Sequence, residues 1–146
     1  MGDKEKLVKV LQSVPASIGY VPMGDEPDYR GFLDEHGIAQ PSAFVPASKD
    51  LVPSELAKRF KAGYPEGAAL FIPGRRFDKN GTRHGRGAGW YDRFLSEVPS
   101  GWVRVGVAAP ELMHEKLERK SWDQPVHFVL VKTPDGYEVW DAGERR

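Results

Sequence analysis

Apolar residues along the chain either form short continuous runs or recur every three or four positions. Continuous runs of this kind are typical of strands, and the run at residues 68–72 fits a strand buried on both faces of a sheet. Strands are therefore predicted at residues 17–21, 43–45, 68–72 and 102–107. Helices are predicted, from the spaced apolar positions, at residues 7–14, 27–37, 54–61, 90–98 and 110–119.

The end of the chain carries a hairpin pattern. Residues 127–131 and 137–140 read as two strands on either side of the turn Pro134-Asp135-Gly136. Because strands and helices alternate before it, we expect a three-layer α/β/α sandwich with a mainly parallel sheet and a closing β-hairpin. In open sheets of this class, ligands bind at the carboxyl ends of the strands.

The composition fits one ordinary globular domain spanning residues 1–146, with 40% hydrophobic and 29% charged residues. The chain has no cysteine, which excludes disulfides and thiolate metal sites. The first six residues are charged and precede no long apolar stretch, so we expect no membrane span and a cytoplasmic location. We expect a monomer or a weak homodimer.

Positive charge is concentrated in one segment of a chain whose formal net charge is zero. Residues 73–93 hold six arginines and lysines against two aspartates. A local patch of this kind attracts a small anion, whereas RNA binding through its arginines is disfavoured by the neutral chain, so no nucleic-acid partner is expected.

The same segment contains the most informative motif of the chain. Glycines at 85, 87 and 89 stand directly before a predicted helix, where free N–H groups and the helix dipole favour an anion. Arg83 and Arg86 add guanidinium groups suited to phosphate, and Asp92 follows in the first helical turn. Glycines, arginines and one acid together indicate a site for a magnesium-bound nucleoside triphosphate.

This motif resembles that of the 5-formyltetrahydrofolate cyclo-ligase family, also called methenyltetrahydrofolate synthetases. The family pattern Pro-Gly-x-x-Phe-Asp, followed by spaced glycines and Gly-Tyr-Tyr-Asp, corresponds to residues 73–78 and to Gly89-Trp90-Tyr91-Asp92, where a tryptophan stands in place of the first tyrosine. Two weaker matches lie at residues 20–26 and 122–126. The resemblance covers most of residues 17–133 and implies the fold expected above.

The resemblance implies an enzyme that converts 5-formyltetrahydrofolate to 5,10-methenyltetrahydrofolate, with ATP as co-substrate and Mg²⁺ as cofactor. It implies catalytic roles for Arg86 and Tyr91 and metal binding by Asp92 and Asp123. For the reduced folate it implies contacts from Val21, Glu26 and Trp90. For the nucleotide it implies contacts from Arg83, Gly85, Arg86, Gly87, Ala88, Gly89, Trp90 and Tyr91.

Structural roles compete with each of these assignments. The glycines could form only a tight turn, the arginines could be solvated, and Trp90 and Tyr91 could belong to the core. Asp92 could serve only the helix dipole, and Glu26 could be a helix-start acid beside Pro27. A catalytically impaired module that binds nucleotide or folate is the alternative at the level of function.

Overall fold

The computed structural model describes residues 1–48, 50–85 and 89–143 of the chain. Its centre is a six-stranded sheet whose first five strands run parallel and whose last strand is antiparallel. The strand order is β2 (Ala43–Phe44), β1 (Ser17–Gly19), β3 (Ala69–Ile72), β6 (Val103–Ala108), β8 (Phe128–Thr133) and β9 (Gly136–Asp141). The mainly parallel sheet and the closing hairpin are thus confirmed.

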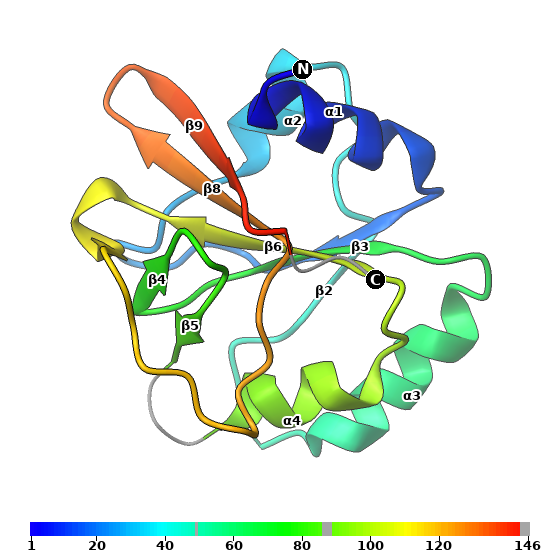
Figure 1. Ribbon diagram of the computed structural model, residues 1–146. Coiled ribbons are helices and arrows are strands. Elements are labelled where there is room, and N and C mark those ends of the chain that lie inside the picture. The colour runs from blue at the N-terminus through cyan, green and yellow to red at the C-terminus, as the bar shows by residue number, and fades with distance from the viewer. Residues whose placement is uncertain (49, 86–88, 144–146) are drawn as a thin grey trace.

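Helices cover both faces of this sheet (Figure 1). On one face lie α1 (Asp3–Ser13) and α2 (Arg30–Glu35), and on the other lie α3 (Pro53–Gly63) and α4 (Trp90–Glu97). This arrangement confirms the three-layer sandwich. Among the described residues, no helix is long and apolar enough to cross a membrane.

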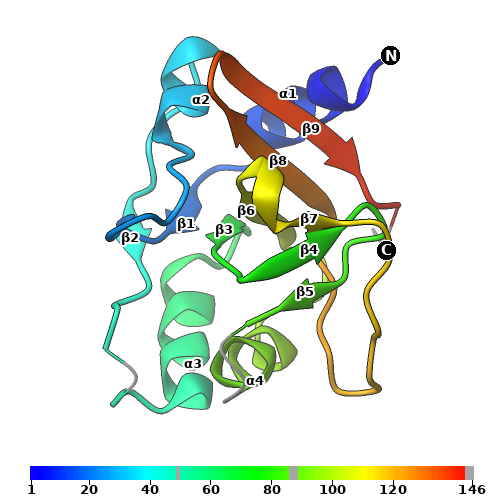
Figure 2. The same ribbon diagram turned by 90° about the vertical axis from the view of Figure 1, so that its left-hand side faces the viewer.

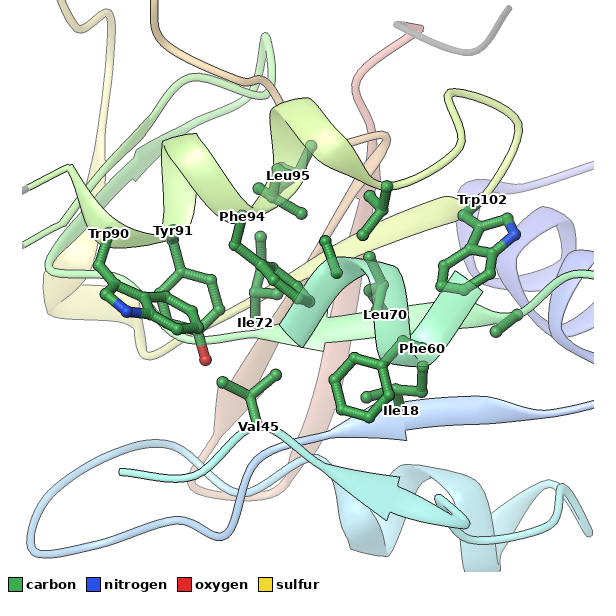
Figure 3. Close-up of a cluster of buried hydrophobic side chains, with 14 of the residues drawn as sticks. Ile18, Val45, Phe60, Leu70, Ile72, Trp90, Tyr91, Phe94, Leu95 and Trp102 are labelled. Carbon is green, nitrogen blue, oxygen red and sulfur yellow. The ribbon is translucent and has the colours of Figure 1, made fainter. Parts of the chain in front are cut away.

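The buried side chains divide into two cores because successive residues of a strand point to opposite faces of the sheet. In β3, Ala69 and Phe71 pack under α1 and α2, whereas Leu70 and Ile72 pack under α3 and α4. Figure 3 shows the second core, in which Leu95 of α4 lies over this strand. The apolar run at residues 68–72 is therefore buried on both sides, as predicted.

Two predicted helices were partly or wholly wrong. The helix expected from residue 27 begins only at Arg30, after a turn in which the Asp28 carboxylate accepts the Arg30 backbone N–H at 2.9 Å. The helix expected at residues 110–119 is replaced by the 3₁₀ turn η1 (Pro110–Leu112), the strand β7 (Met113–His114) and an irregular segment.

The irregular segment follows from long-range hydrogen bonds that compete with helix formation. The Leu117 N–H donates to the Asp78 carboxylate at 2.8 Å, and the Arg119 guanidinium donates to the Asn80 carbonyl at 2.9 Å. Both partners lie 39 positions earlier in the chain. A pattern read over neighbouring residues cannot reveal such partners.

A second, three-stranded sheet was not predicted. It has the order β5 (Arg83–His84), β4 (Arg76–Asp78), β7, and it lies in front of the carboxyl ends of the main sheet in Figure 2. Phe77 anchors it, because its ring packs against Gly106 of β6, where a Cβ would lie 2.4 Å from Phe77 Cε1. Only glycine at this position lets the two sheets approach so closely.

Candidate functional site

A cleft of about 970 Å³ lies at the carboxyl ends of β1, β3 and β6. This is the edge at which ligands bind in open α/β sheets. A smaller cavity of about 370 Å³ has no charged residue among the described ones that line it. The larger cleft is lined by Asp25, Glu26, Pro27, Pro73, Gly74, Arg75, Arg76, Arg83, His84, Gly85, Gly89, Trp90, Tyr91, Asp92, Arg93, Ala109, Glu111, Leu112, Glu118, Lys120, Trp122 and Asp123.

The glycine motif meets α4 at this cleft. Gly89 has φ +73°, the left-handed region that glycine favours, and it immediately precedes the first residue of the helix. Gly85 and Gly89 both line the cleft, and Asp92 occupies the first turn of α4 as the sequence predicts. Residues 86–88, which include the predicted ligands Arg86, Gly87 and Ala88, lie outside the described residues.

Arg83 is a buried cation in the cleft wall rather than a solvated surface arginine. Only 5% of its surface is exposed, its Nε–H donates to the Pro73 carbonyl at 2.6 Å, and its guanidinium lies 4.8 Å from the Tyr91 ring centroid. Burial lowers the pKa of Arg83, and the nearby Tyr91, Asp92 and Asp123 oppose that shift. Arginine remains charged in such surroundings, so the cleft contains a fixed positive group.

The two predicted metal ligands reach the same cleft from different segments. One Asp92 oxygen accepts the Gln124 backbone N–H at 3.0 Å, and one Asp123 oxygen accepts the Lys120 backbone N–H at 2.9 Å. The described residues contain no cluster of three or more histidine, aspartate or glutamate side chains that could hold a metal ion by themselves. Two half-buried carboxylates in a wide cleft fit Mg²⁺, which completes its coordination with phosphate oxygens and water.

Trp90 and Tyr91 belong both to the core and to the cleft wall. The Trp90 ring stacks on Phe94 with centroids 5.4 Å apart, and its indole N–H donates to the Leu51 carbonyl at 3.0 Å. Figure 3 shows both aromatic side chains pointing from the start of α4 into the apolar cluster. Burial raises the pKa of Tyr91, so its phenol stays neutral in the physiological range.

The two residues expected to contact folate have different surroundings. Glu26 lines the cleft and accepts the Met23 backbone N–H at 2.9 Å within a turn, so its interpretation as a helix-start acid is wrong. Val21 is 53% exposed and is not among the described residues that line the cleft.

Sequence reasoning missed the residue that organises the second sheet. Asp78 is fully buried and accepts backbone N–H groups from Asn80, Thr82 and Leu117 at 2.8–3.0 Å. The Asp78-Lys79-Asn80-Gly81 sequence is a turn signature that could have revealed the first two bonds. Trp122 was also missed as a cleft residue: it is 63% exposed, and the Lys120 ammonium lies 5.7 Å from its ring centroid.

His127 is buried and hydrogen-bonded in the interior. Its Nδ1 accepts the Arg104 backbone N–H at 3.0 Å.

Comparison with known proteins identifies one family. The model of the 5-formyltetrahydrofolate cyclo-ligase family matches residues 16–132. A 5-formyltetrahydrofolate cyclo-ligase of Haemophilus influenzae is 40% identical over 63 residues, which cover 42% of this chain. The matched segment spans about a third, 34%, of the Haemophilus protein.

Two solved structures share the fold. A 5,10-methenyltetrahydrofolate synthetase of Mycoplasma pneumoniae aligns with a TM-score of 0.54 and 21% identity, over 86% of this chain and 80% of its own. The synthetase of Aquifex aeolicus, determined by NMR, aligns with a TM-score of 0.51 and 24% identity, over 98% and 82%. At these identities the likeness establishes the fold alone.

Proposed function

Because the chain belongs to the 5-formyltetrahydrofolate cyclo-ligase family, we propose that it converts 5-formyltetrahydrofolate to 5,10-methenyltetrahydrofolate with consumption of ATP. One observation supports this most strongly. The buried cation Arg83, the acids Asp92 and Asp123 and the glycine-flanked start of α4 share one cleft at the carboxyl edge of the sheet. That combination matches a magnesium-bound triphosphate and not a neutral ligand.

The reaction requires positioning more than covalent chemistry by the protein. The formyl oxygen of the folate attacks the γ-phosphorus of ATP and ADP leaves. N10 then attacks the activated formyl carbon, the ring closes, and phosphate departs with the former formyl oxygen. Phosphoryl transfer of this kind depends on orientation and on neutralising the charge of the phosphates.

On the phosphate side, the backbone N–H groups around Gly85 and Gly89 and the Arg83 guanidinium would bind oxygen atoms of ATP. Arg86, Gly87 and Ala88 are proposed for the same set from the sequence motif, with Arg86 at the transferred group. Asp92 and Asp123 would hold Mg²⁺, which when bound screens the charge of the phosphates.

On the folate side, Glu26 would accept hydrogen bonds from the pterin amino and ring N–H groups. Trp90 and Tyr91 form the apolar wall against which a flat ring can lie, and Tyr91 can donate a hydrogen bond through its neutral phenol. Val21 is proposed as a further contact with the folate, although it is not among the described residues that line the cleft.

A second candidate is a module that binds nucleotide or folate without turnover. One structural observation favours it: no described residue that lines the cleft belongs to α1. Lys6 of that helix instead lies 3.7 Å from Asp141 of β9. The lysines of α1, Lys4, Lys6 and Lys9, therefore add no side chain to the described lining of the cleft, which favours a weaker hold on the triphosphate.

Phosphate release from ATP, measured with and without 5-formyltetrahydrofolate, separates the two candidates. The enzyme releases phosphate only when the folate is present. Nucleotide or folate binding without phosphate release identifies the module, and phosphate release that ignores the folate contradicts both.

A further inference from the structure

Arg104 is a second buried arginine, and it lies behind the cleft rather than in its lining. Its neighbours on β6, Val103 and Val105, face α1 and α2, so Arg104 points to the opposite side, towards α4. Its Nη2 donates to the Leu95 carbonyl at 2.9 Å. Its Nη1 donates to Gln124 Oε1 at 3.0 Å and to the Pro125 carbonyl at 3.3 Å.

All of these acceptors are neutral groups. Only 7% of Arg104 is exposed, and its Nε has no hydrogen-bond partner among the described residues. Burial lowers the pKa of Arg104, an effect opposed by the charge of Asp92. Burying a charge without a paired countercharge is unfavourable, and an apolar side chain of similar length would fill this space at lower cost. Stability alone therefore does not explain an arginine here.

The positions of the groups that Arg104 contacts explain why an arginine stands here. Leu95 lies three positions after Asp92 on α4, and Gln124 directly follows Asp123. Gln124 also donates its backbone N–H to Asp92 Oδ1 at 3.0 Å. Arg104 thus holds the helix that contains one proposed metal ligand against the segment that contains the other.

We infer that Arg104, acting through Gln124, is a positioning residue that sets the separation of the Asp92 and Asp123 carboxylates for a divalent cation. The inference rests on the proposed magnesium site and adds to it a residue that touches neither metal nor substrate. Removal of a residue that orients a metal ligand through hydrogen bonds commonly weakens metal affinity by one to two orders of magnitude.

The test is Mn²⁺ binding to the ATP-loaded protein, followed by electron paramagnetic resonance of free Mn²⁺. Gln124→Ala removes one acceptor of Arg104 and leaves the core intact. Its matched control is Gln40→Ala, which removes side-chain bonds of 2.9 and 2.8 Å to the Arg30 carbonyl and Asp34 outside the cleft. We expect the Kd for Mn²⁺ to rise roughly tenfold in Gln124→Ala and to stay unchanged in Gln40→Ala.

Arg104→Met, which removes every bond to the guanidinium, should raise the Kd for Mn²⁺ further. If that variant does not fold, Gln124→Ala decides. A wild-type Kd in a folded Gln124→Ala or Arg104→Met protein would overturn the positioning role while the metal site stands. Absence of Mn²⁺ binding to the ATP-loaded wild type would overturn the metal site itself, and this inference with it.

Discussion

The interior of the six-stranded sheet and the wall of the cleft are stabilised by different means. The interior consists of fully buried apolar side chains such as Leu70, Phe71 and Val105. The wall, formed by the small sheet and the segment after β7, depends on polar groups that bind backbone: Asp78 accepts three N–H groups, and Arg83 donates to a carbonyl. Loss of a core side chain should affect stability alone, whereas loss of a wall residue should also affect the ligand site.

The largest expected effect comes from the core. Leu70→Ala leaves a cavity under α3 and α4 and should lower the free energy of unfolding by about 3–5 kcal/mol, measured by urea denaturation. The folded fraction should bind ATP with unchanged affinity. Val52→Ala, at a residue that is 50% exposed, should change stability by no more than about 0.5 kcal/mol. If the folded Leu70→Ala protein binds ATP more weakly, core residues affect the ligand site as well, and the distinction between core and wall is wrong.

Asp78→Ala should destabilise the protein by roughly 2–4 kcal/mol, because it leaves buried backbone N–H groups without an acceptor. Unlike the core variant, it should also weaken ATP binding, since β4 and the segment around Leu117 flank the cleft. Calorimetric titration of the folded protein measures this second effect. Exposed Glu97→Ala is the control, and a loss of stability with full ATP affinity would show that Asp78 serves the fold only.

Arg83→Met tests the cleft cation directly. The change removes a charge-assisted contact worth roughly 1.5–3 kcal/mol, so the Kd for ATP should rise about tenfold or more. Arg59→Met, on the exposed face of α3, should leave the Kd unchanged. Equal ATP affinity of the two variants would remove Arg83 from the proposed phosphate site.

The smallest effect is expected at the surface pair of Asp28 and Arg30, whose side chains are each 43% exposed and 2.8 Å apart. The hydrogen bond to Arg30 lowers the pKa of Asp28 from its ordinary 3.8, so the pair contributes stability above that pH and loses it as pH falls through the lowered pKa. Asp28→Asn should cost less than about 1 kcal/mol at pH 7. Thermal melts should show this difference shrinking below pH 3.8. If the difference in melting temperature does not change with pH, it does not come from the Asp28–Arg30 ion pair but from the hydrogen bond of the Arg30 backbone N–H to residue 28.

The contrast between the sheet interior and the cleft wall also explains which features the sequence could predict. The run at residues 68–72 and the closing hairpin are local patterns, and both predictions are confirmed. The glycines before a helix with Asp92 in its first turn are a local pattern as well, and the structure places Gly85, Gly89 and Asp92 at the cleft.

The second sheet and the segment after η1 depend on partners distant in sequence, such as Asp78 and Leu117. The apolar spacing at residues 110–119 therefore predicted a helix that those bonds prevent. The burial of Arg83 and Arg104 was hidden for a related reason, since an arginine is ordinarily exposed and its backbone acceptors have no sequence signature.

We propose that the cleft closes the ring of 5-formyltetrahydrofolate with ATP. The most direct test of this proposal is the absorbance of methenyltetrahydrofolate formed at saturating ATP and Mg²⁺, for the wild type and for Asp92→Asn, which keeps the shape of the side chain and removes its charge. We predict product in the wild type, with an elevated KM for ATP because α1 contributes nothing to the described cleft, and a large loss in Asp92→Asn. No product at any ATP concentration, from wild-type protein that still binds nucleotide or folate, would contradict the enzyme and identify a binding module.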